Sequence, residues 1–172
     1  MKLKVTQENF NKALAVVSRV AASKASLPIL ANVLITAEKN SIVLAATNLE
    51  IAITYTLAGK VEKPGSITVP ARLINDFVSS LPAGNIDMEL DGSSLNLSTE
   101  HYQSTINGTS PDEFPSLPSI DSSSSHKLDS SKFRQALQQT VLAASSDEAR
   151  QVLTGVLMKT HEKNLFLVAT DS

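Results

Sequence analysis

Three histidines are the residues of this chain best placed for acid–base chemistry or metal binding near neutral pH: His101, His126 and His161. None of them stands at a metal-binding spacing such as HxxxH from another candidate ligand. Serines are abundant, but no GxSxG elbow surrounds one of them. An α+β hydrolase with a Ser/His/Asp site therefore stays open on residue types alone, although no spacing favours it.

Other catalytic patterns are equally weak. The chain has no cysteine, which excludes disulfides, thiol chemistry and cysteine-ligated metal clusters. Its six glycines form neither GxGxxG nor GxxxxGK[ST], the loops that hold nucleotide phosphates. The acidic pairs Asp112-Glu113 and Asp147-Glu148 could act as acids or metal ligands, but adjacent carboxylates are more typical of a solvated turn or a helix start. We expect a binding scaffold rather than an enzyme, with no cofactor and no metal.

The composition is that of an ordinary globular chain. Of its 172 residues, 42% are hydrophobic and 19% charged, which is sufficient for a sizeable core. The formal net charge of -2, without a cluster of lysine and arginine, disfavours a tight reader of DNA sequence. The N-terminal MKLKVTQENF lacks the apolar run of a signal peptide, and no stretch approaches membrane-spanning length. We therefore expect a cytoplasmic protein with no membrane association.

The order of predicted elements is a strand, a helix and three strands, found twice. In the first set, Thr6 is expected to cap a helix that runs to about residue 20 and buries the face with Phe10 and Leu14. Strands are predicted at 2–5, 30–37, 41–46 and 49–57 and, in the second set, at 66–69, 85–90, 94–98 and 101–107. The second helix, near residues 71–80, should bury Leu73, Ile74, Phe77, Val78 and Leu81. The predicted fold class is α+β, with two helices packed on antiparallel sheet.

The chain also repeats itself at an offset of 123 positions. Residues 5–49 align with residues 128–172 without a gap, and 11 of the 45 positions are identical. A stretch rich in proline and serine, from 111 to 127, separates the two copies and indicates an interdomain connection. We therefore expect a first domain over residues 1–122 and an incomplete, truncated second domain over residues 123–172.

Six motifs, in order along the chain, resemble the bacterial sliding clamp family, the beta subunit of DNA polymerase III. They are LPILANVLI (27–35), AATNLEIAI (45–53), TVPARLINDFVSSLP (68–82), DEFPSLP (112–118), FRQALQQTVLAASSDEARQVLTGVL (133–157) and VATDS (168–172). The resemblance implies the DNA clamp fold, in which each domain holds two strand-helix-three-strand units. It also implies a processivity factor whose full-length homodimer closes a ring around double-stranded DNA. The implied protein partners are DNA polymerase III, clamp-loader subunits and other proteins with a clamp-binding motif.

The resemblance assigns two groups of site residues. The helix patterns put Lys12, Arg19, Arg72 and Arg134 on solvent-facing sides, and the resemblance makes these sides line the ring. Lys24, Arg150 and Gln151 match loop positions where such clamps touch DNA. Leu153, Thr170 and Ser172 match the beginning of the family's peptide-binding pocket, although the His-Arg-Leu that usually follows is not in this chain. A DNA-independent protein-interaction module is a third reading, and primer extension that did not depend on the ring would favour it.

Overall fold

The computed structural model describes residues 1–21, 27–39, 41–117, 127–162 and 164–172. The chain divides into two compact units, Met1–Pro118 and Ser119–Ser172, each with its own sheet structure. No helix among the described residues is long and apolar enough to cross a membrane.

The first unit contains the expected order of elements twice, with one additional strand. The first set is β1 (Lys2–Thr6), α1 (Gln7–Val17), a 3-10 turn (Pro28–Ala31), β2 (Asn32–Glu38), β3 (Ser41–Thr47) and β4 (Ala52–Ala58). The additional strand is β5 (Lys60–Lys63). The second set is β6 (Gly65–Pro70), α2 (Ala71–Ser80), β7 (Asn85–Asp91), β8 (Ser94–Ser98) and β9 (Gln103–Asn107), followed by a 3-10 turn (Pro111–Glu113).

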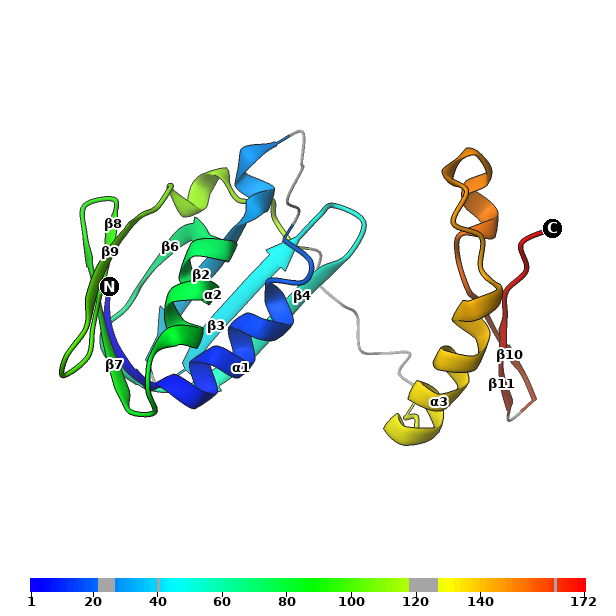
Figure 1. The fold of residues 1–172 in the computed structure, drawn as a ribbon, viewed down its shortest axis with the longest axis horizontal. Helices are drawn as coiled ribbons and strands as arrows, with labels where there is room; N and C mark the ends of the chain where they lie inside the picture. Colours follow the sequence, from blue (N-terminus) through cyan, green and yellow to red (C-terminus); the bar gives the residue numbers. More distant parts are fainter. Residues whose placement is uncertain (22–26, 40, 118–126, 163) are drawn as a thin grey trace. The chain divides into compact units, whose positions relative to one another are not determined.

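The first unit contains two antiparallel sheets, and the opening strand of each set pairs with the strands of the other set. One sheet has the order β4-β3-β2-β6 and the other β5-β1-β7-β8-β9, so each set of three strands is joined by the opening strand of the other set. The two helices lie side by side against the β4-β3-β2-β6 sheet (Figure 1). Because neither set can complete a sheet alone, the two sets form one domain with one core.

The core face of α1 agrees with the sequence pattern, whereas that of α2 differs at one residue. Phe10 and Leu14 are fully buried, and Val20 is buried beyond the helix end. In α2, Leu73 is 59% exposed, so its predicted burial is wrong. The buried face runs through Ala71, Ile74 and Val78, at steps of three and four residues, and Leu73 lies outside it. The others of the predicted set are Phe77, which is half-buried, and Leu81, which is buried.

Several predicted boundaries and the first cap are also corrected. Helix α1 ends at Val17 rather than near residue 20, and β2 begins at Asn32 because Pro28 opens a 3-10 turn. Thr6 occupies the N-cap position, but its hydroxyl makes no capping hydrogen bond. The Gln7 backbone amide instead donates to the Gly84 carbonyl at 2.8 Å, which gives the first amide of the helix a partner outside it.

Strand β4 begins three residues later than predicted because a tight turn precedes it. Leu49 has a left-handed backbone, with φ 76°, and the Asn48 side chain accepts hydrogen bonds from the amides of Glu50 and Ile51. The turn therefore occupies the residues that alternate like a strand in the sequence. The strand predicted from 101 also begins later, at Gln103, whereas the strand predicted from 66 begins one residue earlier, at Gly65.

The second unit reproduces the opening of the first. It contains α3 (Ser130–Thr140), 3-10 segments Val141–Ala143 and Glu148–Leu153, β10 (Leu157–His161) and β11 (Asn164–Val168). Helices α1 and α3 begin and end 123 positions apart. Lys39 and Glu162, also 123 apart, are both left-handed in their hairpins, with φ 46° and 53°. The internal repeat therefore extends to single backbone conformations.

Burial differs sharply between the two copies. Strands β10 and β11 form a two-stranded sheet, and no residue of α3 is fully buried. Among the described residues, this unit has no counterpart of β4 or β6 to extend the sheet. Its apolar side chains accordingly remain more exposed than their equivalents in the first unit.

Candidate nucleic-acid interface

The first candidate cation, Lys12, projects from the exposed side of α1. Its Nζ donates a hydrogen bond to Oε1 of Glu8 at 2.7 Å, one helical turn earlier. This hydrogen bond and the lysine charge lower the pKa of Glu8, and the carboxylate correspondingly raises the pKa of Lys12. Both side chains are solvated, so the ion pair contributes little to stability, and Lys12 already has an anionic partner.

A second pair of the same spacing lies on α2. The Nε atom of Arg72 is 3.7 Å from Oδ2 of Asp76, and the arginine side chain is 92% exposed. Arg72 and Asp76 also border a hollow of about 460 Å³ between the C-terminal end of α1 and the N-terminal end of α2. Arg72 is therefore free to reach an extended ligand, but only in competition with Asp76.

Arg19 and Arg134 are exposed cations in the two units. Arg19 follows the C-terminus of α1, and Arg134 lies in the first half of α3. Neither is within 4.0 Å of a carboxylate among the residues that the structure describes. Lys24, the remaining predicted cation of the first unit, lies outside the described residues.

Arg150 and Gln151 lie in the 3-10 segment Glu148–Leu153. Arg150 has a non-helical backbone that kinks this segment, and its Nε lies 3.7 Å from Oδ2 of Asp147. Its Nη2 also donates to the Asp171 carbonyl at 3.3 Å. Gln151 is exposed, and its carbonyl accepts the amide and the hydroxyl of Thr154. The segment thus presents one tethered cation and one neutral amide to solvent.

The predicted pocket residues are partly brought together. Leu153 and Thr170 line a hollow of about 410 Å³, whose remaining lining residues are Val152, Gly155, Val156, Leu157, Val168 and Ala169. Ser172 is not part of this lining, and it instead exchanges hydrogen bonds with Thr170. The lining is mainly aliphatic, which suits apolar side chains of a bound peptide.

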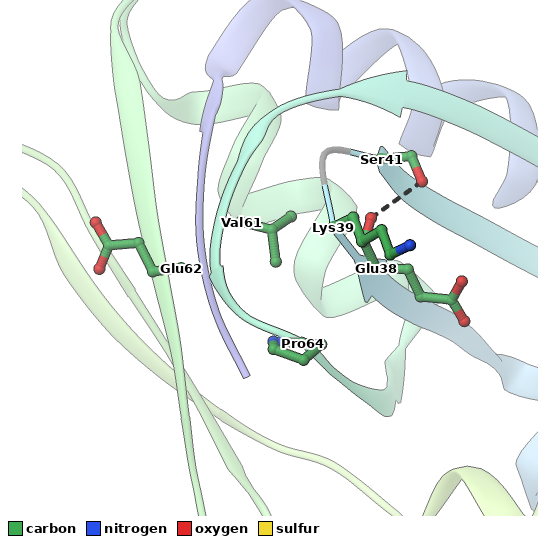
Figure 2. A pocket seen from close by; sticks show the side chains of 6 residues that line it. All are labelled: Glu38, Lys39, Ser41, Val61, Glu62 and Pro64. Carbon is green, nitrogen blue, oxygen red and sulfur yellow. Dashed lines mark hydrogen bonds between the residues drawn. The ribbon is translucent and has the colours of Figure 1, made fainter.

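A larger hollow, of about 860 Å³, was not expected from the sequence. It lies between the β2–β3 hairpin and the β5–β6 connection, with Val61 and Pro64 beside Lys39 (Figure 2). The Ser41 hydroxyl already donates to the Glu38 carbonyl at 3.2 Å, and the Glu62 carboxylate points away from the hollow. The polar groups around it therefore do not converge on a common point, unlike those of a typical catalytic site.

The histidines do not form a metal or catalytic cluster within the described part of the chain. His101 and His161 are exposed, and the described residues contain no group of three or more His, Cys, Asp and Glu side chains that could hold a metal ion. His126 lies outside the described residues. The remaining candidate chemistry is thus electrostatic, at the exposed cations, and apolar, at the hollow beside Leu153 and Thr170.

Comparison with known families identifies the group of proteins to which the chain is related. Residues 1–118 match the model of the DNA polymerase III beta subunit, N-terminal domain, and residues 127–172 match that of its central domain. The chain belongs to the DNA polymerase III beta subunit family. The family expected from the six sequence motifs is confirmed.

Individual relatives of this beta-subunit chain agree with the assignment. A beta sliding clamp of Synechococcus elongatus is 38% identical over 99% of the chain and 46% of its own length. The solved DNA polymerase sliding clamp of Bacillus subtilis has a TM-score of 0.95 at 26% identity, over 99% of the chain and 47% of its own length. The Pseudomonas aeruginosa sliding clamp bound to griselimycin has a TM-score of 0.93 at 29% identity, over 99% of the chain and 47% of its own length. The α+β clamp fold is therefore confirmed, and the chain spans about half the length of these relatives.

Sequence patterns alone did not reveal how the cations of this beta-subunit chain are paired. The spacings Glu8–Lys12, Arg72–Asp76 and Asp147–Arg150 are all visible in the sequence and are those at which helical side chains meet. These spacings are the sequence feature from which the ion pairs could have been predicted. The large hollow beside Val61 had no comparable signal, because β5 was not predicted.

Proposed function

We propose that this chain is the N-terminal part of a ring-shaped sliding clamp that encircles double-stranded DNA and tethers a replicative polymerase. The observation that carries this proposal is the match to the solved Bacillus subtilis sliding clamp over 99% of the chain, with a TM-score of 0.95. A closed ring holds DNA topologically, so it needs only weak contacts to phosphates, and a formal net charge of -2 is no obstacle.

The DNA-facing residues of this proposal are Lys12, Arg19, Lys24, Arg72, Arg134, Arg150 and Gln151. Exposure supports the six that are described, since all of them project into solvent. The cations among them would contact the sugar-phosphate backbone without reading bases. Loss of any one should therefore reduce binding to all sequences alike.

The proposed partner site begins with Leu153, Thr170 and Ser172. Its aliphatic hollow supports binding of short peptide motifs from DNA polymerase III, clamp-loader subunits and other clamp-binding proteins. We further propose that the full-length protein is a cytoplasmic homodimer and no enzyme, with domains over 1–122 and from 123 onward.

Topological retention on DNA tests the function directly. The full-length protein, assembled on nicked circular DNA by a clamp loader, should remain bound at salt concentrations that disrupt ordinary electrostatic binding. Cutting the circle once should release it by sliding over the ends. Equal retention on circular and linear DNA would contradict the clamp. Hydrolysis that one Ser or His substitution abolished would favour the hydrolase instead.

A further inference from the structure

In the first unit, two of the cations proposed to face DNA are already engaged by carboxylates of their own helices, and Arg150 of the second unit lies similarly close to Asp147. Glu8 holds Lys12 at 2.7 Å in α1, and Asp76 lies 3.7 Å from Arg72 in α2. Both helices belong to the first unit and lie side by side against one sheet (Figure 1). The carboxylates are exposed, with side-chain exposures of 72% and 65%, so each lies where an approaching phosphate would also meet its cation.

An ion pair of this kind weakens a phosphate contact in two ways. The phosphate must displace the carboxylate from the cation, and afterwards the freed carboxylate repels the phosphate at short range. Binding affinity for DNA depends on salt because each neutralised phosphate releases counterions. A cation that exchanges one anion for another contributes less to that release than an unpaired cation does.

We propose that Glu8 and Asp76 act as built-in competitors for the DNA backbone, which keep the contacts of Lys12 and Arg72 weak enough for the clamp to slide. This proposal rests on the function proposed above and concerns the strength of that same interface. On both helices the positive charge would be masked by the paired carboxylate. Each cation would contact a phosphate only after its ion pair breaks.

A purely structural role is the alternative for these pairs. Acid and base four residues apart also stabilise a solvated helix. A stabilising role would alter thermal unfolding but not the dependence of DNA binding on salt. The two roles therefore predict different measurements.

The chain offers a matched control of identical composition. Asp87 pairs with Lys4 at 3.1 Å and Glu89 with Lys2 at 3.4 Å, between neighbouring strands β1 and β7. These residues alternate with the buried Leu3, Val5, Ile86 and Met88, so they lie on the sheet face turned away from the core and its helices. The variant D87N/E89Q changes one Asp and one Glu, as D76N/E8Q does, and shifts the net charge equally.

The decisive measurement is the slope of log affinity against log salt for a short DNA duplex bound by the full-length protein. In E8Q/D76N the slope should steepen, by at most about 0.9 for each freed cation, and sliding on long DNA should slow. D87N/E89Q should keep the wild-type slope. Adding K12Q and R72Q to E8Q/D76N should return the slope to the wild-type value, because the freed cations are then absent.

Failure of this proposal differs from failure of the proposed function. If the protein is retained on circular DNA but E8Q/D76N has the slope of D87N/E89Q, the competition between carboxylate and phosphate is refuted and the clamp stands. An unchanged slope accompanied by a lower melting temperature would assign the pairs to helix stability. If the wild-type protein is held equally on linear and circular DNA, the clamp itself fails.

Discussion

Ile35 and Met158 occupy equivalent positions of the internal repeat, yet Ile35 is fully buried and Met158 is 60% exposed. Ile35 lies on β2 between β3 and β6, whereas β10, which carries Met158, has β11 as its single described neighbour. The difference shows how much of the burial depends on strands beyond the copied segment. It also makes the two positions a matched pair for experiment.

Truncating the two side chains should therefore have unequal effects on stability. Ile35→Ala should lower the free energy of unfolding of the first unit by about 2–5 kcal/mol, because it leaves a cavity in a packed core. Met158→Ala should cost within about 0.5 kcal/mol, as is usual for exposed positions. Urea unfolding followed by tyrosine fluorescence measures the first effect, since both tyrosines, Tyr55 and Tyr102, lie in the first unit. Equal costs would contradict the described burial.

Amide hydrogen exchange should separate the two copies of the helix. Helix α1 buries Phe10 and Leu14, while α3, of the same length, has no fully buried residue. Local opening costs less where few apolar contacts are lost, so the amides of α3 should exchange faster than those of α1. The same ordering is expected for residues 128–172 against 1–110. Equal protection of α1 and α3 would show that the second unit is better packed than its burial indicates.

The sequence specified the periodic features and not those decided by neighbouring elements. The buried face of α1 followed from helical spacing, and the repeat at 123 positions predicted the second unit. Leu73 was misassigned because apolar residues on α2 suit two adjacent faces, and packing against the sheet selects the one with Ile74. Strand β5 was missed because Lys60–Lys63 has a single apolar residue, Val61, as is usual for a charged edge strand.

The cap of α3 should titrate at unusually low pH. The pKa of Asp129 lies below its ordinary value of 3.8, mainly because the Ser131 hydroxyl donates to its carboxylate, assisted by the backbone amide of Lys132. A lowered pKa means that the cap stabilises the helix above about pH 3.8 and that this contribution is lost as pH falls through the lowered value. The chemical shift of the Lys132 amide should therefore titrate with a midpoint below 3.8, and D129N should remove the transition. A midpoint at or above 3.8 would contradict the cap.

A side chain at Gly108 should destabilise the first unit, because backbone from strand β6 approaches this residue closely. A Cβ atom at this position would lie 2.5 Å from the Thr68 carbonyl oxygen and 2.7 Å from Cγ1 of Ile67. The Thr68 carbonyl also accepts the Thr109 amide at 2.9 Å, so it cannot move away without losing that bond. Gly108→Ala should lower the free energy of unfolding by about 1–3 kcal/mol. Gly84→Ala, whose Cβ would meet nothing within 4 Å, should be close to neutral, and equal losses in the two variants would refute the clash.

The proposed peptide pocket makes a prediction about binding that is independent of DNA. Leu153 and Thr170 line the same aliphatic hollow, whereas Leu142 is exposed and lies outside it. A buried apolar anchor often costs more than 1 kcal/mol when truncated, so Leu153→Ala in the full-length protein should weaken binding of a clamp-binding peptide by about tenfold. Leu142→Ala should leave the affinity unchanged, since its side chain is not part of the hollow. Fluorescence anisotropy of a labelled peptide measures both. A loss confined to Leu142→Ala would move the binding surface away from Leu153, while retention on circular DNA should persist in either variant because it depends on ring closure.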